Sequence, residues 1–430
     1  MLSQVSEIHI TAVVSVRQRH GFVIINQDGK DRVGIPNIDN HVDQLEPRLP
    51  EEEIYRRTGR WPTGLFVGPR LQWVKKADPD LWTDVASVTS LSDWIGWRLT
   101  GRLVYEYSQA TETALLDVRT RQWDISLCDA WEVDRSLLPE LAMAGVSLGQ
   151  IGKDSARALG LPVGVPVIIG AADTQCSVHA IPARIGDVVI IAGSTTPVVR
   201  MVGEAILDAN ARLWTNCHLT PQQWLIESNC GVTGSNYEWV CRALYSDGGY
   251  AVMEREMRDA SHLNGCHTAL GPGPMVAKSG FPPGWGVLFL PRPIPFTLSR
   301  AFLASSVLWD MACAIRANVE QLDSIVPLHK KYRIWGVGGG FQSATLWQMI
   351  TNLLQCPVSS IAGGHQASLL GAARLAMTGG GQQPNHNVDI WEFSHPSMPP
   401  NEVDKAYRNW QCWHDKMTVI NQKVMRGDRM

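Results

Sequence analysis

The sequence lacks the patterns that mark several common classes of protein. Its 430 residues carry a formal net charge of −3, so there is no basic excess that could neutralise a nucleic acid backbone. Its longest apolar runs, such as Pro162 to Ala172, are far shorter than the roughly 20 residues that span a bilayer. The N-terminus has neither the basic start nor the long apolar core of a secretory signal. We therefore expect no nucleic acid partner and no membrane association.

Cysteine and histidine patterns are also missing. The nine cysteines are scattered and never form a CxxC pair, and the twelve histidines include no HExxH. A disulfide framework or a structural zinc site would need tighter spacing. We therefore expect free thiols, no set of metal-ligating side chains, and a cytoplasmic location.

The sequence has the size and the strand pattern of a two-domain α/β protein. A chain of 430 residues is too long for one hydrophobic core. Three apolar strands each end in a turn of small residues: Val167–Ile169 before GAAD, 187–192 before GSTT, and Ile334–Val337 before GGG. This repetition predicts loops gathered at one end of a sheet.

Other segments indicate local structure. Ile8 to Val16 is β-branched and apolar, which predicts a strand, and Phe22 to Ile25 followed by Asp28-Gly29 predicts a hairpin. Residues 50–130 are expected to be mostly helical, and a last helix is expected from Asn401 onward.

Asp173 is the first candidate for chemistry. It follows the strand in IIGAAD, and the small residues before it allow a tight turn and a close approach by a substrate. A carboxylate placed there can accept a proton from a substrate hydroxyl. Taken alone, the pattern fits an N-cap for the next helix at least as well.

Two further turns could hold phosphate or nucleotide. Backbone N–H groups and hydroxyls in GSTTP at 193–197 can bind phosphate oxygens, although a plain polar turn would have the same sequence. VGGGFQSATLW at 337–347 could let a planar or anionic group lie on the backbone, although it could also be an ordinary entry into a helix. It is neither a Walker P-loop nor a spaced dinucleotide fingerprint.

The order and spacing of these turns resemble the FGGY carbohydrate kinases, relatives of actin and hexokinase. The sugar-side motifs of that family are similar to TAVVSVRQRHGFVII at 11–25, PNIDNH at 36–41 and SLSDWIGWRLTGRLVYEYSQATETALLD at 90–117. The nucleotide side resembles GGGFQSATLWQMITNLLQCPV followed by ASLLGAARLA. The resemblance covers roughly residues 8–376.

The resemblance implies two ribonuclease-H-like domains with a cleft between them. Residues 1–182 would form the sugar-binding domain and 183–430 the nucleotide-binding domain, with a last helix that can pack back on the first. The implied reaction is transfer of the γ-phosphoryl group of Mg-ATP to a hydroxyl of a small sugar or polyol, with Asp173 as the general base and with ATP and Mg²⁺ as cofactors. A homodimer is a further expectation.

The family motifs also assign binding residues. Those expected to face the sugar are Gln18, Arg19, His20, Asp39 and Gln175. Those expected to hold the nucleotide are Ser194, Thr195, Gly338, Gly339, Gly340, Gln342 and Ser343.

One family motif is absent from the sequence. Members begin with an Asp-x-Gly-Thr turn that binds phosphate, and no such motif precedes Ile8. Either the natural protein is longer, or the chain is a reduced member that binds a sugar or acts as a regulator with impaired catalysis. Within the family, QRHG favours a xylulokinase-like substrate, whereas SNCGVTGSNYEW at 228–239 resembles the autoinducer-2 kinases.

Overall fold

The structure, a computed structural model, describes residues 9–39, 41–42, 44–258, 267–279, 284–296, 298–327, 332–382, 389–393 and 395–425. Ile8 and Asn40, which belong to segments interpreted above, lie outside these ranges. The chain forms two compact units, and each is made of three segments. The first unit contains Met1–Pro182, Val202–Leu225 and Ala367–Asn387, and the second contains Ala183–Met201, Ile226–Gln366 and Val388–Met430.

A three-stranded sheet with the order β3-β2-β4 lies in the first unit. Strands β2 (Phe22–Asn26) and β3 (Asp31–Ile35) form the antiparallel hairpin predicted from Asp28-Gly29, and Gly29 adopts a φ of +70° in its turn. Strand β4 (Val85–Ser90) pairs with the other edge of β2. This strand falls within the region that we expected to be mostly helical.

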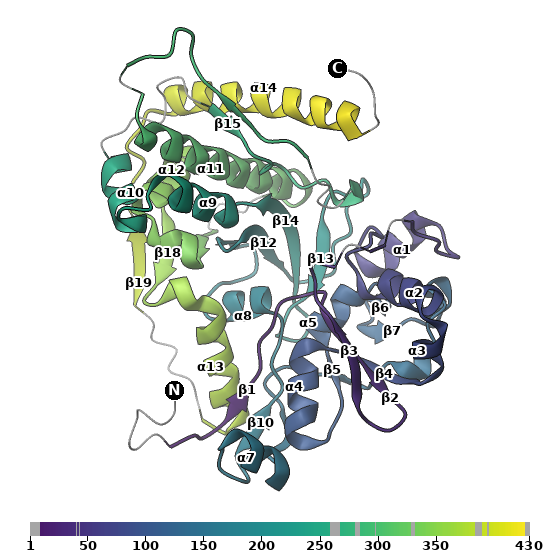
Figure 1. The fold of residues 1–430 in the computed structure, drawn as a ribbon. Coiled ribbons are helices and arrows are strands. Elements are labelled where there is room, and N and C mark those ends of the chain that lie inside the picture. The colour runs from purple at the N-terminus through teal and green to yellow at the C-terminus, as the bar shows by residue number, and fades with distance from the viewer. Residues whose placement is uncertain are drawn as a thin grey trace. The chain divides into compact units, whose positions relative to one another are not determined.

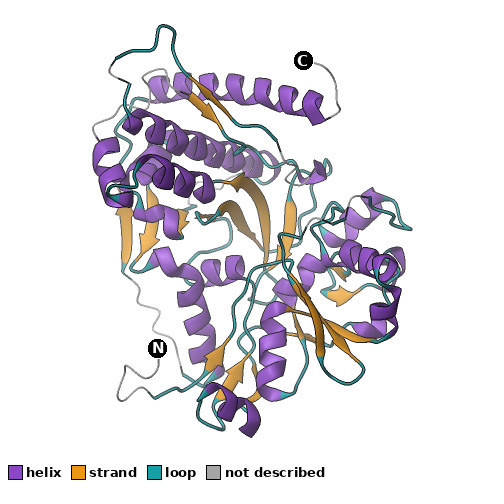
Figure 2. Ribbon diagram, viewed as in Figure 1, coloured by secondary structure: helices purple, strands orange, loops and turns teal. Residues whose placement is uncertain are grey.

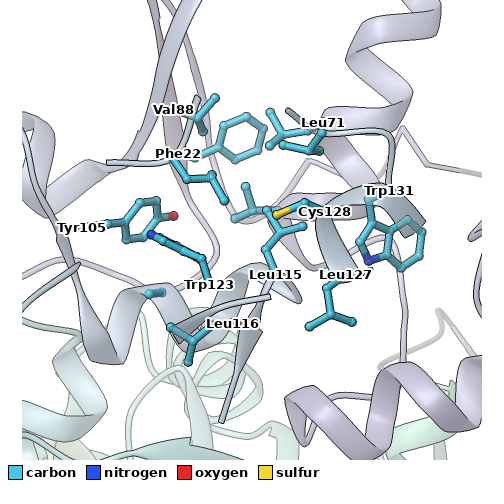
Figure 3. Packing of buried hydrophobic residues seen from close by; sticks show 14 of the residues in the cluster. Phe22, Leu71, Val88, Tyr105, Leu115, Leu116, Trp123, Leu127, Cys128 and Trp131 are labelled. Carbon is cyan, nitrogen blue, oxygen red and sulfur yellow. The ribbon is translucent and has the colours of Figure 1, made fainter. Parts of the chain in front are cut away.

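A hydrophobic core of the first unit includes the buried side chains of this sheet. Figure 3 shows Phe22 of β2 and Val88 of β4 above the side chains that the helices and short strands bring in. Aromatic rings contribute much of the packing: Tyr105 meets Trp123 edge to face, with ring centroids 5.2 Å apart. Figure 3 labels Phe22, Leu71, Val88, Tyr105, Leu115, Leu116, Trp123, Leu127, Cys128 and Trp131.

A second small sheet, with the order β1-β10-β9, carries the turn that contains Asp173. Strand β1 (Val13–Val14) runs parallel to β10 (Pro166–Ile168), and β9 (Ser147–Gln150) pairs with β10 on its other side. The strand expected from Ile8 to Val16 is therefore much shorter in the structure. Helix α8 (Asp173–His179) follows β10 and packs on α13 (Ala367–Gly379), as Figure 1 shows.

The remaining elements of the first unit are short. Its other helices are α1 (Glu51–Thr58), α2 (Val67–Ala77), α3 (Pro79–Thr83), α4 (Leu91–Thr100), α5 (Tyr107–Ala110), α6 (Ile125–Ala130) and α7 (Lys153–Leu159), with 3₁₀ turns η2 (Thr111–Thr113) and η3 (Arg135–Leu137). Its other strands are β5 (Tyr105–Glu106), β6 (Leu116–Asp117), β7 (Gln122–Trp123), β8 (Leu141–Ala142) and β13 (Trp214–Cys217).

The sheet of the second unit follows the order β14-β12-β11-β17-β18-β19. Its centre is parallel, because β11 pairs with β17 and β17 with β18 in the same direction, whereas β12 and β19 run antiparallel to their neighbours. This arrangement confirms the predicted α/β architecture. The strands are β11 (Val188–Ile191), β12 (Thr195–Val202), β14 (Trp224–Val232), β17 (Ile334–Val337), β18 (Val358–Ile361) and β19 (Ile390–Phe393).

Helices cover this sheet, as Figure 2 shows in purple. They are α9 (Gly234–Leu244), α10 (Gly249–Arg258), α11 (Arg300–Ile325), α12 (Ala344–Leu354) and α14 (Pro400–Met425). The hairpin of β15 (His267–Ala269) and β16 (Val287–Phe289) and the turns η4 (Ala277–Ser279), η5 (Gly339–Gln342) and η6 (Gly364–Gln366) complete the described elements.

The last helix, α14, begins close to the expected Asn401. The sequence left open whether this helix packs back on the first domain. Its contacts with α11, α12 and β15 lie within the second unit. Among the described residues, no helix combines the length and the apolar composition needed to cross a membrane.

Candidate active site

Asp173 is the first residue of α8. The residue at the N-cap position is Ala172, which cannot offer a side-chain capping bond, and the N–H of Thr174 donates to Oδ1 of Asp173 at 2.7 Å. The cap that we considered as an alternative role for Asp173 is therefore one position earlier. The side chain of Asp173 is only partly buried, so its carboxylate remains within reach of a ligand.

Asp173 lines a cavity of about 400 Å³ within the first unit. The lining comes from the segment after β1, the start of α4, the start of α8 and the start of α13. Its residues are Val16, Arg17, Gln18, Leu91, Trp94, Ile95, Asp173, Ser368 and Leu369. Among the described residues of this lining, Asp173 contributes the one carboxylate, and Gln18 contributes an amide that can both donate and accept.

Close backbone pairing explains why Gln18 and Asp173 share this cavity. The N–H of Asp173 donates to the carbonyl of Arg17 at 3.2 Å, and Arg17 forms a parallel bridge with Ala172. Two residues earlier in each segment, the two backbones approach so closely that a Cβ on Gly170 would lie 1.6 Å from the Ser15 carbonyl oxygen. Only glycine fits at this position, which explains why the turn noted in the sequence consists of small residues.

Arg19 and His20 are buried beside the cavity and are absent from its lining. Both lie next to Glu112: Nη1 of Arg19 is 3.4 Å from Oε1, and Nδ1 of His20 is 3.4 Å from Oε2. His20 adopts a left-handed backbone with a φ of +68°, and its carbonyl accepts a hydrogen bond from Arg70 at 2.8 Å. The structure thus places these two residues in a buried network behind Gln18.

Arg60 completes this network. Its guanidinium donates to both carboxylate oxygens of Glu112, at 2.9 and 3.3 Å, and to the Thr215 carbonyl at 3.1 Å. A further bond reaches the amide oxygen of Asn216, and the Arg60 guanidinium lies 5.0 Å from the ring centre of Trp214. Arg60 and Glu112 are both 0 % exposed, so this ion pair is fully desolvated.

The two other residues expected to bind sugar lie outside the lining. Asp39 pairs with Nδ1 of His41 at 2.5 Å. Burial alone would raise the pKa of the Asp39 carboxyl, but the hydrogen bonds and charge of His41, together with the charge of Arg70, lower it. Gln175 is completely buried, and neither atom of its amide has a hydrogen-bond partner within the described residues. Because residues two apart in a helix point to different sides, Gln175 faces away from the direction of Asp173.

A second cavity, of about 390 Å³, lies within the second unit. Of the residues expected to bind nucleotide, Ser194, Gly339, Gly340, Gln342 and Ser343 line it, whereas Thr195 and Gly338 lie directly beside lining residues. Gly193, which belongs to the GSTTP turn predicted to bind phosphate, also lines it. No role was predicted from sequence for the other lining residues, which are Ala192, Gly234, Tyr237, Glu238, Tyr250 and Glu254. The two expected turns, after β11 and β17, therefore form one wall.

Glycine is required where these turns meet. Gly338 has a φ of +94°, and a Cβ there would lie 2.6 Å from the carbonyl oxygen of Ala192. A Cβ on Gly234 would lie 2.2 Å from the Gly193 carbonyl oxygen, which brings the start of α9 against the same turn. At Gly339 a Cβ would meet nothing closer than 4.0 Å, so this backbone is open to the cavity, and a flat ligand could lie on it.

We predict that Gly338→Ala weakens binding of ATP at least tenfold, because the alanine forces the Gly-rich turn away from Ala192. Calorimetric titration with Mg-ATP measures the change. Gly160→Ala is the matched control, because Gly160 also has a positive φ, of +66°, but a Cβ there meets no atom within 4 Å. Equal ATP affinity in Gly338→Ala and Gly160→Ala would contradict this prediction.

Polar groups are held in place on the other wall of this cavity. The Tyr237 hydroxyl donates to Oε1 of Glu254 at 2.6 Å, and the Thr345 hydroxyl donates to Oε2 at 3.0 Å. Burial, followed by the neighbouring Glu254 charge, holds the pKa of Tyr237 well above its usual range. The SNCGVTGSNYEW segment contains Gly234 and Tyr237, but only the fold brings Glu254 from α10 beside them.

The comparisons with known proteins agree with this geometry. The family model for the N-terminal domain of the FGGY family of carbohydrate kinases matches residues 3–179, and that for the C-terminal domain matches residues 188–379. A solved xylulose kinase from Rhodospirillum rubrum has the same fold at 22 % identity, with a TM-score of 0.78 over 96 % of this chain and 86 % of its own. A xylulose kinase from Lactobacillus acidophilus matches with a TM-score of 0.81 at 19 % identity, over 98 % of this chain and 88 % of its own.

These observations define a kinase built from two ribonuclease-H-like domains. YoaC of Bacillus subtilis, whose name classes it with the sugar kinases, is 40 % identical over 86 % of this chain and 76 % of its own length. The autoinducer-2 kinase of Escherichia coli K12 is 25 % identical over 96 % of this chain and 82 % of its own length. The chain belongs to the FGGY family of carbohydrate kinases, and it is a phosphotransferase that uses ATP to phosphorylate a sugar.

Proposed function

We propose that the chain phosphorylates a hydroxyl of a small pentulose-like sugar or polyol, with Asp173 as the general base and Mg-ATP as the donor. The observation that carries this proposal is the cavity in the first unit, where Asp173 and Gln18 both lie in the lining and Asp173 is the one carboxylate that the described residues provide. A carboxylate is acceptor-only when ionised, so it can take the proton of an attacking hydroxyl. Gln18 can orient a neighbouring hydroxyl of the same sugar.

The cavity in the second unit supports the donor half of the proposal. It combines an open glycine backbone at Gly339 with the hydroxyl of Ser194 and the side chains of Gln342 and Ser343. Such a wall suits an adenosine and its phosphates, because the backbone permits close approach and the hydroxyls can bind phosphate oxygens.

The family implies Mg²⁺ as the companion of ATP. Kinases hold Mg²⁺ chiefly through the phosphates of the nucleotide and only a few protein oxygens. The described residues include no group of three or more His, Cys, Asp or Glu that could hold a metal ion. Bound chiefly through those phosphates, the ion would neutralise charge on the transferred phosphoryl group.

For the acceptor, we propose a small hydroxylated sugar. Among the relatives named above, the two xylulose kinases act on xylulose and the autoinducer-2 kinase on autoinducer-2, according to their names. A cavity of about 400 Å³ with few polar groups in its lining suits a ligand of this size. Hydroxyl patterns would be discriminated by a few hydrogen bonds, each worth on the order of 1–3 kcal/mol when one partner is left unpaired.

The test is an ADP-release assay over a panel of pentuloses, polyols and autoinducer-2-like diketone sugars, with the product identified by mass spectrometry. We expect turnover on at least one pentulose or related sugar and a product heavier by one phosphate. Calorimetric binding of a sugar without any ADP release would overturn the proposal. That outcome would favour instead the silent sugar-binding role considered from the sequence.

A further inference from the structure

A buried chain of hydrogen bonds leads from two acidic side chains to the residue before Asp173. Oδ2 of Asp93 accepts the N–H of Glu106 at 3.0 Å and the hydroxyl of Ser90 at 2.6 Å. Oε2 of Glu106 in turn accepts the hydroxyl of Ser108 at 2.5 Å. The Ser108 oxygen then accepts the N–H of Ala172 at 3.0 Å.

The Ser108 hydroxyl has a fixed orientation in this chain. A serine hydroxyl has one proton to donate, and the acceptor it meets is Glu106, so a lone pair is left to face Ala172. Ser108 is 0 % exposed and Glu106 is 1 % exposed, so water cannot replace either partner. The backbone N–H of Ala172, immediately before Asp173, is therefore bonded to the Ser108 side chain, whose own orientation is fixed by Glu106.

Helix α5, which contains Ser108, also bonds to the second backbone segment that lines the cavity. Nε2 of Gln109, the residue after Ser108, donates to the Arg17 carbonyl at 3.4 Å. That carbonyl also accepts the N–H of Asp173 at 3.2 Å. Helix α5 thus bonds to both backbones that meet at the cavity, one directly before Gln18 and one directly before Asp173.

A third wall of the cavity is tied to the same chain through Asp93. Asp93 lies on α4, which contributes Leu91, Trp94 and Ile95 to the lining. Its bond to the N–H of Glu106 therefore connects α4 with the start of α5. Three of the lining segments are thus joined to one buried pair of carboxyls.

Burying the carboxyl groups of Asp93 and Glu106 costs free energy, so their position needs an explanation. Burial raises the pKa of Glu106 to about 8 and that of Asp93 to about 6. A structural core needs no such groups, because an apolar pair of similar size avoids the desolvation penalty. Buried acids with raised pKa values are found disproportionately where a reaction requires an oriented group.

We propose that Glu106 and Ser108 are positioning residues that hold the backbone of Asp173, and with it the carboxylate, in the orientation needed for proton abstraction. The inference rests on the proposed role of Asp173 as the base. Neither residue lines the cavity, so neither is expected to touch the sugar. Their effect should fall on the rate of the chemical step and leave binding of ATP unchanged.

The test compares Ser108→Ala with Ser306→Ala in the full chain, on the best substrate from the panel. Ser306 is a matched buried serine of the second unit, with 2 % exposure and a bond from its hydroxyl to the Leu303 carbonyl at 2.8 Å. Ser108→Ala should lower kcat on the order of ten- to a hundredfold, since small misplacements of a reacting group cost that much, while KM for ATP stays within twofold. Ser306→Ala should lose stability and keep its kcat.

Two further variants keep the result decisive. Ser108→Thr retains the hydroxyl and should retain kcat, and Ser108→Cys, a weak acceptor of similar shape, should lose it even if the alanine variant folds poorly. Full activity of Ser108→Ala or Ser108→Cys, or equal kcat losses in Ser108→Ala and Ser306→Ala, would overturn the inference. An Asp173→Asn variant with wild-type activity would remove the proposed function itself, which separates the two failures.

Discussion

Asp173→Asn is expected to reduce kcat for sugar phosphorylation by roughly 10² to 10⁴, the usual contribution of a general base. The asparagine has nearly the same shape and can still accept the Thr174 N–H that Oδ1 of Asp173 accepts at 2.7 Å. What it loses is the ability to take up a proton from the sugar hydroxyl. Because no other carboxylate lines this cavity in the part of the chain that the structure describes, no described neighbour within the lining can substitute.

Steady-state kinetics and calorimetry together check this prediction. Calorimetry should show ATP binding unchanged, since the cavity expected to hold ATP lies in the second unit. Asp134→Asn is the matched control, because Asp134 likewise accepts a neighbouring backbone N–H, that of Ser136 at 2.8 Å, but lies outside the lining. Activity of Asp173→Asn within tenfold of the wild type would exclude Asp173 as the base.

The second large effect is on stability. Arg60→Met is expected to lower the free energy of unfolding by about 3–5 kcal/mol, the cost of leaving one partner of a buried ion pair uncompensated. Glu112 would keep the longer contacts with Arg19 and His20, each at 3.4 Å. The Thr215 carbonyl and the Asn216 amide would lose their bonds to the same guanidinium.

Urea unfolding followed by tryptophan fluorescence measures this loss, with Trp214 as a reporter beside Arg60. Arg102→Met is the matched control, because the Arg102–Glu140 pair is 2.7 Å long but more than half exposed, and exposed pairs contribute about 0–1 kcal/mol. Adding Glu112→Leu to Arg60→Met should recover part of the loss, because both charges are then gone. Similar losses in Arg60→Met and Arg102→Met would rule out a desolvated pair.

Local patterns predicted much of the α/β framework. The strand Ile334–Val337 was predicted correctly because it is an apolar run that ends in a glycine triplet, and the hairpin because Asp28-Gly29 is a strong turn signal. Strand β4, with the sequence VASVTS, has no such turn after it and was missed within a region expected to be helical. Its strand conformation follows from pairing with β2, which a local pattern does not reveal.

The same distinction applies to the two cavities. Asp173, Gln18 and the Gly-rich turns could be found from sequence because each is a turn with its own composition. Glu112 and Glu254 could not, because their partners Arg60 and Tyr237 are 52 and 17 residues away and nothing local distinguishes these two glutamates. The roles predicted for Asp173, Gln18 and the Gly-rich turns remain predictions, as do those for Arg19, His20, Asp39 and Gln175.

The discontinuity of the first unit has a consequence for the growing chain on the ribosome. The buried guanidinium of Arg60 donates a hydrogen bond to the carbonyl of Thr215. Helix α8 packs against α13 so closely that a Cβ on Gly371 would lie 1.9 Å from the Cys176 carbonyl oxygen. Both partners are synthesised after all of residues 1–182, and α13 is synthesised after every strand of the second unit's sheet except β19. Although N-terminal domains generally fold first during synthesis, the first unit cannot complete its packing until its own later segments have been synthesised.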